Sequence, residues 1–268
     1  MIKQDFHVHT KFSGDSLEKV ENQIDRAIEL NLEFLCITDH CDFNLYSKKE
    51  YVLDVDSYVN EINVLKEKYK NKIKLFLGIE MGLVPRFKEK INNFLDSYNF
   101  DFVIGSSHAV NEIDIGYNVN KYFGNKSEKQ AYREYFESIL ENVNVFDNYD
   151  VYGHLDYVVR YSPYESRHFD LKDYEDVIYE IMKSIIENGK GIEINTAGIR
   201  KNLGYSHPHK DILKMYKNLG GEIITIGSDA HACQHLGYKF EDVPELLKST
   251  GFKYYTVFEN RQPKFIYI

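Results

Sequence analysis

The chain has 268 residues, of which 43% are hydrophobic and 28% charged, a composition that excludes disorder, collagen-like repeats and low-complexity arrays. Its 33 Lys and Arg against 42 Asp and Glu give a net charge of −9 with neutral histidines, which disfavours tight, non-specific binding to duplex DNA. A chain of this length folds without a disulfide or a structural metal, so any metal site must be justified by its chemistry.

The cellular location is indicated by what the sequence lacks. Three cysteines without a CxxC pair favour reduced thiols in the cytoplasm. The N-terminal residues MIKQDFHVHT do not resemble a signal peptide, and no apolar run approaches the ~18 residues of a membrane span. We therefore expect a cytoplasmic protein with one domain over residues 1–268. Its expected partner is a small molecule rather than a nucleic acid or a membrane, and the oligomeric state stays open.

Short apolar runs alternate with amphipathic helical patterns along the chain. The predicted strands are Gln4–Val8, Phe34–Thr38, Lys74–Ile79, Phe102–Ser106, Val151–Gly153, Gly191–Asn195 and Glu222–Gly227. The predicted helices are Leu17–Leu30, Val55–Tyr69, Phe87–Tyr98, Ser127–Asn142, Leu171–Asn188, Lys210–Asn218 and Val243–Ser249. Residues Lys253–Ile268 are expected to form a short C-terminal tail. Seven βα units predict an α/β fold with parallel strands, either as a barrel or as an open sheet.

Histidines and acids gather at the C-terminal ends of the predicted strands. They are His7, His9, His40, Glu80, His108, His154, Asp229 and His231. An open sheet would spread these positions over roughly 30 Å, at about 4.8 Å per strand. A barrel brings them together at its C-terminal rim, where barrel enzymes carry their active sites. The pattern therefore favours a TIM-like (βα)7 barrel with a site at that rim.

The spacing of these residues indicates metal binding. His7 and His9 are two positions apart on a strand and share a face, and Asp229 and His231 repeat the arrangement. Imidazole combined with carboxylate suits Zn, Mn or Fe better than Mg or Ca. With Asp15, nine candidate ligands are available, enough for three ions or for two ions with spare groups. Asp15 is also a plausible N-cap of the first helix, as is Ser16.

Six motifs occur in order between residues 5 and 231. They are HVHTKFSGDS, ITDH, GIEMG, SSHAV, GHLD and GSDAH. In this set the chain resembles the polymerase-and-histidinol-phosphatase (PHP) superfamily, which implies a distorted seven-stranded barrel and a trinuclear metal centre. The resemblance assigns the first ion to His7, His9, Glu80 and Asp229. It assigns the second to Glu80, His108 and His154, and the third to Asp15, His40 and His231. Some members have His in place of Asp15.

Two further segments, GHLDYVVRY and EINTAGIRK, resemble the stand-alone histidinol-phosphate phosphatases of this superfamily. The resemblance implies hydrolysis of L-histidinol phosphate in histidine biosynthesis, with three divalent ions of Zn, Mn or Fe. Arg160, beyond His154, is the expected catalytic and substrate-binding arginine, because a guanidinium can grip phosphate at two points. The further expected substrate contacts are Arg200, His207 and Tyr117. Asp229 and His231 are candidate catalytic residues that relay a proton to the leaving group, and a water is a third candidate.

Three alternatives stay open. A PHP phosphoesterase acting on a nucleotide, on an oligonucleotide end or on another small phosphomonoester would use the same metal ligands. An amidohydrolase-type barrel also opens with HxH, but it relies on a bridging lysine or a differently placed histidine pair, whereas this chain has Glu80 in that place. A metal store or sensor would not need the two arginines.

Overall fold

The main sheet is parallel throughout and follows the chain order around a ring. The computed structural model describes residues 1–43, 53–165 and 167–268. The strand order is β1 (Gln4–Asp5), β2 (Phe34–Ile37), β4 (Lys74–Gly82), β5 (Phe102–Ser106), β8 (Val151–Tyr152), β9 (Gly191–Asn195) and β10 (Ile224–Gly227). A short strand, β3 (His40–Cys41), also pairs with β4.

The first and last strands of this order meet and nearly close a barrel. The Phe6 amide donates to the Ile226 carbonyl at 3.0 Å, and the His9 amide donates to the Ala230 carbonyl at 2.9 Å. The buried Asp5 carboxylate accepts the Ser228 amide at 2.9 Å across the same seam. The expected TIM-like α/β barrel is thereby confirmed, and the C-terminal ends of its strands share one mouth.

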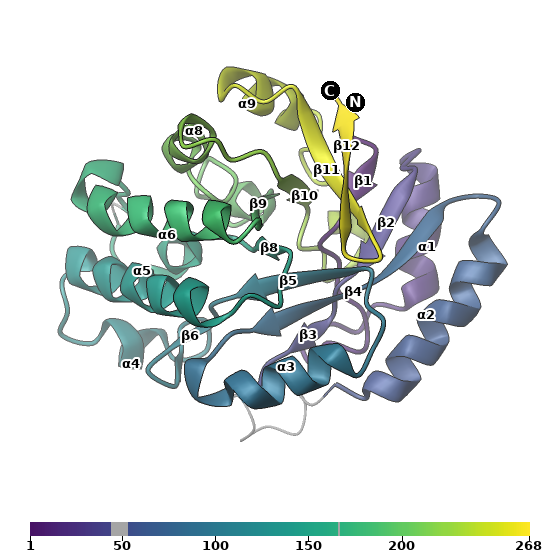
Figure 1. Cartoon of the computed structure of the whole chain (residues 1–268), viewed down its shortest axis with the longest axis horizontal. Coiled ribbons are helices and arrows are strands. Elements are labelled where there is room, and N and C mark those ends of the chain that lie inside the picture. The colour runs from purple at the N-terminus through teal and green to yellow at the C-terminus, as the bar shows by residue number, and fades with distance from the viewer. Residues whose placement is uncertain (44–52, 166) are drawn as a thin grey trace.

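Helices surround the strands (Figure 1). They are α1 (Val20–Glu29), α2 (Val55–Tyr69), α3 (Lys88–Asp96), α4 (Val119–Phe123), α5 (Glu128–Val145), α6 (Glu175–Glu187), α7 (Ala197–Arg200), α8 (Lys210–Asn218) and α9 (Val243–Ser249). Short 3-10 turns are η2 (Pro85–Phe87), η3 (Tyr157–Tyr161), η4 (Leu171–Asp173) and η5 (Cys233–His235). No helix within the described ranges has both the length and the apolar character needed to cross a bilayer.

Aromatic rings fill the barrel away from its mouth. The Phe6 and Phe102 ring centroids lie 5.3 Å apart, Phe6 and Phe76 lie 5.4 Å apart, and Phe258 packs on Phe102 at 5.1 Å. All four side chains are buried. Because apolar rings fill this part of the barrel, its interior is a packed core rather than a channel.

The first helix starts later than predicted. It begins at Val20, and its N-cap is Lys19, whose side chain makes no capping hydrogen bond. The expected start at Leu17 is therefore wrong, and neither Asp15 nor Ser16 caps the helix. Ser16 donates instead to the His231 carbonyl at 2.9 Å. Asp15 is thus available for the barrel mouth.

The expected C-terminal tail is instead an antiparallel hairpin of β11 (Tyr254–Glu259) and β12 (Gln262–Tyr267). Its two turn residues, Asn260 and Arg261, have φ values of 51° and 62°, the left-handed conformation of a tight hairpin turn. This hairpin was not predicted because Asn-Arg is not a typical pair of turn residues. The Arg261 Nε donates to the Asp150 carboxylate at 2.6 Å, so the turn is tied to the start of β8.

We predict that Arg261→Ala lowers the free energy of unfolding by about 1–3 kcal/mol, because it leaves the buried Asp150 carboxylate without its charged partner. Urea denaturation followed by circular dichroism measures the change. The control is Lys70→Ala, which breaks the exposed Lys70–Glu67 pair and should change the value by less than about 0.5 kcal/mol. Equal losses in the two variants would contradict this role of the hairpin turn.

Candidate metal centre

A fully buried carboxylate, Glu80 in β4, lies at the centre of the barrel mouth. Its Oε2 lies 2.9 Å from His40 Nδ1 and 3.1 Å from His7 Nε2. Its Oε1 lies 2.8 Å from His154 Nε2 and 3.1 Å from His108 Nε2. Four imidazoles from four separate segments therefore converge on one carboxyl group.

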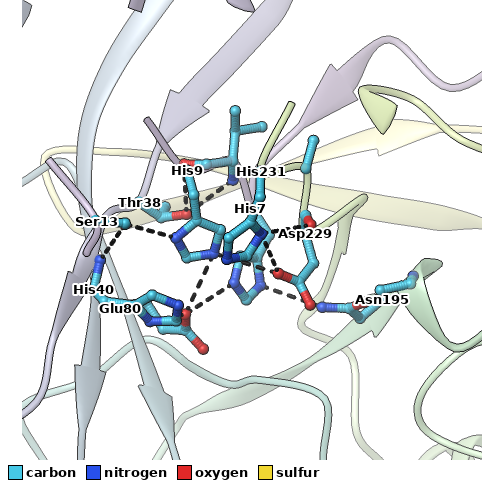
Figure 2. A network of polar contacts seen from close by, with 12 residues as sticks. His7, His9, Ser13, Thr38, His40, Glu80, Asn195, Asp229 and His231 are labelled. Atoms are coloured by element: carbon cyan, nitrogen blue, oxygen red, sulfur yellow. Dashed lines mark hydrogen bonds and ion pairs between the residues drawn. The ribbon is translucent and has the colours of Figure 1, made fainter. Parts of the chain in front are cut away.

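The remaining candidate ligands adjoin this centre (Figure 2). The His9 ring stacks on His40 and on His231, with centroid distances of 4.2 and 4.1 Å. His9 Nε2 lies 3.4 Å from Asp229 Oδ1. The Asp15 carboxylate lies 3.1 Å from His231 Nε2. The structure thus brings together all nine residues that the sequence singled out.

The strands explain this convergence. His7 and His9 alternate with Val8, so both imidazoles leave the same face of the chain. His40 in β3 is in register with Glu80 in β4. Asp229 has a φ of 53°, a left-handed conformation that is uncommon outside glycine and is concentrated at functional sites.

The donor set fits bound metal ions. His7 Nε2, His9 Nε2, His40 Nδ1 and Glu80 Oε2 are buried and make no hydrogen bond within the described residues. Buried polar atoms without a well-directed hydrogen bond are costly, and a cation at their centre would satisfy them. Four sets of three ligand atoms lie within 4.8 Å of one another. They are His9, His40 and His231; His7, His9 and Asp229; His7, Glu80 and His154; and His40, Glu80 and His108.

These sets overlap and only partly match the division that the resemblance implies. His9 is grouped with His40 and His231, where the resemblance placed Asp15. The reason is geometric, because the His9 ring lies against both other rings while Asp15 lies at the partly exposed edge of the cluster. His108 and His154 each fall in a set with Glu80, but in different sets.

Charges within the cluster shift the pKa values of the candidate ligands in both directions, and the neighbouring carboxylates raise those of His7, His40 and His108. Burial alone would raise the pKa of Glu80, but His7, His108 and His40 hold it well below its ordinary value. Burial lowers the pKa of His9, and the neighbouring His231 and His40 lower it further. Glu80 is therefore a carboxylate and His9 a neutral imidazole with a free lone pair.

Polar residues behind the cluster fix the orientation of the rings. Glu193 Oε1 lies 2.6 Å from His7 Nδ1, and Asp42 Oδ1 lies 3.0 Å from His108 Nδ1. Ser13 Oγ lies 3.1 Å from His9 Nδ1. Such contacts aim the other ring nitrogen at a metal. None of these three residues was predicted as a site residue from the sequence. The available signal for Glu193 is its place two positions before Asn195, the last residue of β9, because the two side chains share one face of the strand.

A cavity of about 490 Å³ opens beside the cluster. Asp15, His40, His108, His154, Asp229 and His231 line one side of it, and the lining also includes Gly116, Tyr117, Tyr157, Arg160, Tyr161, Arg200, Lys201, Ala232 and His235. Arg160 Nη1 donates to Asp229 Oδ2 at 3.1 Å, and Arg200 Nη2 donates to the Asp229 carbonyl at 2.8 Å. Tyr117 is 55% exposed at the cavity wall. Three of the four expected substrate contacts therefore face the cavity.

The fourth, His207, is buried and does not line the cavity. Its Nδ1 lies 2.5 Å from the buried Asp156 Oδ1, and the other oxygen of Asp156 accepts the His209 amide at 2.9 Å. Asp156 also immediately precedes η3, which carries Arg160. This position suits a supporting role better than substrate contact. His235 also lines the cavity.

We predict that Glu193→Gln weakens zinc binding by about 10–100-fold. The two Glu193 oxygens accept from His7, from the His154 amide and from Asn195, and the NH₂ of an amide cannot replace the second acceptor. Competition with a zinc chelator measures the affinity. Glu180→Gln, at an exposed position on α6, is the matched control and should bind zinc as the wild type does. Unchanged affinity in Glu193→Gln would show that Glu193 does not orient His7.

We predict that His207→Ala lowers the free energy of unfolding by about 3 kcal/mol, because Asp156 would keep a buried charge without its partner. His168→Ala, at an exposed position, should change it little. Thermal unfolding and phosphate binding are measured on both variants. Weaker phosphate binding with unchanged stability would instead support a substrate contact for His207.

The chain resembles known proteins over nearly its whole length. Residues 5–197 match the model of the PHP domain family. The chain is 36% identical over 252 residues to a histidinol-phosphatase of Lactococcus lactis, covering 94% of this chain and 93% of the relative. It is 34% identical to a probable histidinol-phosphatase of Clostridium acetobutylicum, covering 97% and 98% of the two chains. A crystal structure of the histidinol phosphate phosphatase from Lactococcus lactis, complexed with zinc, L-histidinol and phosphate, superimposes with a TM-score of 0.90 at 35% identity over 98% of each chain. The chain belongs to the PHP domain family.

Proposed function

We propose that this protein is a metal-dependent histidinol-phosphatase, which hydrolyses L-histidinol phosphate to L-histidinol and phosphate in histidine biosynthesis. The names of the relatives from Lactococcus lactis and Clostridium acetobutylicum support this assignment over nearly the whole chain. The structure of similar fold was solved with both products, L-histidinol and phosphate, and with zinc. The chain's own geometry supports the same class of reaction.

The observation that carries the proposal is the pair of arginines beside the metal cluster. Both guanidinium groups contact Asp229, which is itself a candidate metal ligand. A guanidinium has five N–H donors, and within the described residues Arg160 uses two of them, to Asp229 and to Tyr161. The remaining donors suit a planar, bidentate grip on a phosphate next to the metals. A metal store or sensor has no use for such a pair.

We propose three divalent transition-metal ions as cofactors, with Zn, Mn and Fe as the candidates. The proposed ligands are His7, His9, Asp15, His40, Glu80, His108, His154, Asp229 and His231. When bound, such ions supply an acidified water as the nucleophile and offset the charge of the phosphate. Glu80 would hold more than one ion, because its Oε1 faces His108 and His154 while its Oε2 faces His7, His9 and His40.

Substrate recognition is divided between two sides of the cavity. Arg160 and Arg200 hold the phosphate, and Arg160 also stabilises charge that develops in the transition state. Tyr117 borders the position of the imidazole ring. Asp229 and His231 complete the reacting centre as metal ligands in contact with one another, Asp229 Oδ1 lying 3.4 Å from His231 Nδ1. His207 supports the site indirectly, through its contact with Asp156, which immediately precedes η3.

We also propose that the chain acts in the cytoplasm as one domain over residues 1–268. The buried Cys36 and Cys41 and the half-buried Cys233 are all free thiols, as expected in a reducing compartment. The C-terminal hairpin packs on the barrel through Phe258 and Arg261 rather than forming a core of its own.

We predict that the metal-replete protein hydrolyses L-histidinol phosphate with the highest kcat/KM in a panel of phosphomonoesters, at least about tenfold above nucleoside monophosphates. The physical reason is that Tyr117 borders the leaving group, whereas the arginines bind the phosphate that all these esters share. Phosphate release measures each rate. A higher kcat/KM for a nucleotide, with little turnover of L-histidinol phosphate, would favour the alternative PHP phosphoesterase.

We predict opposite signatures for His9→Ala and Arg160→Ala. The first removes a ligand shared by two of the ligand sets and should lose both bound metal and activity. The second should keep its metal content, while kcat/KM falls by at least ~10²-fold. Elemental analysis and phosphate release distinguish the two losses. An active His9→Ala variant, or an Arg160→Ala variant with wild-type kinetics, would contradict the assigned roles.

A further inference from the structure

The cavity contains a phenol that none of the proposed roles uses. Tyr161 ends η3 and lines the cavity beside Arg160. Its oxygen accepts from Arg160 Nη2 at 3.0 Å and from the Tyr157 hydroxyl at 3.2 Å. A phenol oxygen has two acceptor positions and one proton. Because both acceptor positions are used, the Tyr161 proton points away from Arg160 and Tyr157. No acceptor for it is found among residues 1–43, 53–165 and 167–268.

Arg160 links the phenol to the candidate metal ligand Asp229. One terminal nitrogen of the guanidinium contacts Asp229 and the other contacts Tyr161. A phosphate that binds both terminal nitrogens of Arg160 would have Asp229 beside one nitrogen and the Tyr161 hydroxyl beside the other. In phosphoryl transfer, the attacking and leaving oxygens are roughly in line on opposite sides of phosphorus. A nucleophile that approaches from the metal side places the leaving oxygen toward Tyr161.

The other candidate proton donors are poorly placed. Asp229 Oδ1 faces His9 and His231, and its Oδ2 accepts from Arg160, so both oxygens act as acceptors. His231 lies between Asp229 and Asp15 within the ligand cluster, on the side of the nucleophile. Neither residue is therefore free to protonate a group that leaves in the opposite direction.

The surroundings of Tyr161 favour release of its proton. Burial alone would raise the pKa of the phenol, but the Arg160 charge and the hydrogen bonds from Tyr157 and Arg160 lower it below its ordinary value. Asp229 is the neighbouring charge that opposes this effect. The Arg160 guanidinium also lies over the Tyr161 ring, 5.0 Å from its centroid. A tyrosinate formed here would keep a cation and a hydrogen-bond donor beside its oxygen.

A glycine lets the neighbouring loop cover the two phenols. A Cβ atom at Gly116 would lie 3.2 Å from the Tyr161 hydroxyl oxygen and 3.3 Å from that of Tyr157. The backbone of this loop therefore packs closely on the phenol pair. Tyr157 is held from its other side by His154, with ring centroids 4.7 Å apart. The Tyr161 hydroxyl is thus fixed in position before any substrate binds.

We propose that Tyr161 is the catalytic residue that donates the proton to the leaving ester oxygen. This inference rests on the proposed phosphomonoesterase function. As the ester P–O bond breaks, its electron pair passes to the ester oxygen, which takes the Tyr161 proton and leaves as the alcohol. The attacking water forms the new P–O bond, keeps one proton on the product phosphate and gives the other to solvent. The tyrosinate then regains a proton from solvent.

The test compares Tyr161→Phe with the wild type on two kinds of ester, in metal-replete protein. The alkyl ester is L-histidinol phosphate, or the best alkyl phosphomonoester of the panel if the wild type prefers another. The aryl ester is p-nitrophenyl phosphate, whose leaving group departs without protonation. We expect kcat to fall by at least ~10²-fold on the alkyl ester and by less than about threefold on the aryl ester. Tyr179→Phe, an exposed tyrosine on α6 outside the cavity, should be unchanged on both.

A binding measurement separates proton donation from support of Arg160. Calorimetric titration with inorganic phosphate should give the same Kd, within about twofold, for Tyr161→Phe and the wild type, whereas Arg160→Ala should bind phosphate more weakly. Equal loss of kcat on both esters, weaker phosphate binding by Tyr161→Phe, or full alkyl-ester activity in that variant would each overturn the assignment. Failure of the wild type on L-histidinol phosphate alone would contradict the proposed substrate but would leave the comparison of alkyl and aryl esters intact.

Discussion

The burial of Glu80 among four imidazoles is the constraint on which the rest of the site depends. The carboxyl group has no exposed surface, and the nearest ring nitrogens lie 2.8–3.1 Å from its oxygens. Burying so many hydrogen-bond acceptors together, away from water, is unfavourable unless a positive charge lies among them. Divalent ions supply that charge. The same requirement accounts for the acids and serines that fix the rings from behind, since a poorly aimed imidazole would not reach the ion.

The barrel provides this arrangement because its two ends are built differently. One end is closed by aromatic rings and by the hairpin of β11 and β12, whose Phe258 packs on Phe102. At the other end, the ligands come from β3, β4 and the segments that follow β1, β5, β8 and β10. The packed end holds the strands in register, so ligands distant in the sequence keep fixed distances. The short helices η3 and α7 then place the arginines and tyrosines over the ligands.

Much of this arrangement could be predicted from the sequence. The bounds of β5, β9, α2, α8 and α9 match the predicted segments, because each has a clear apolar period and clear ends. All nine candidate ligands meet at one mouth, because the C-terminal ends of all the strands in a parallel barrel lie at the same end of it. The HxH and SDAH spacings indicated the site directly, because each places two candidate ligands on the same face of the chain.

The residues and contacts that could not be predicted from the sequence depend on tertiary structure rather than on a sequence motif. Glu193 is a single acid inside an apolar strand, and nothing local shows that its oxygen lies 2.6 Å from His7. His207 was expected from the sequence as a substrate contact, but its pairing with Asp156, 51 positions away, was not, because that contact depends on two loops meeting. Tyr161 is one of 22 tyrosines, and only the contacts of its oxygen distinguish it from the others. Such residues depend on tertiary contacts that periodicity does not encode.

The central claim is that the barrel mouth holds transition-metal ions on the residues around Glu80. An anomalous difference map from crystals of the zinc-loaded protein, recorded at the zinc absorption edge, tests it most directly. Peaks are expected within about 2 Å of His7 Nε2, His9 Nε2 and the Glu80 oxygens. A map from zinc-loaded, active protein with no peak at these atoms, or with zinc bound only at other places on the surface, would contradict it.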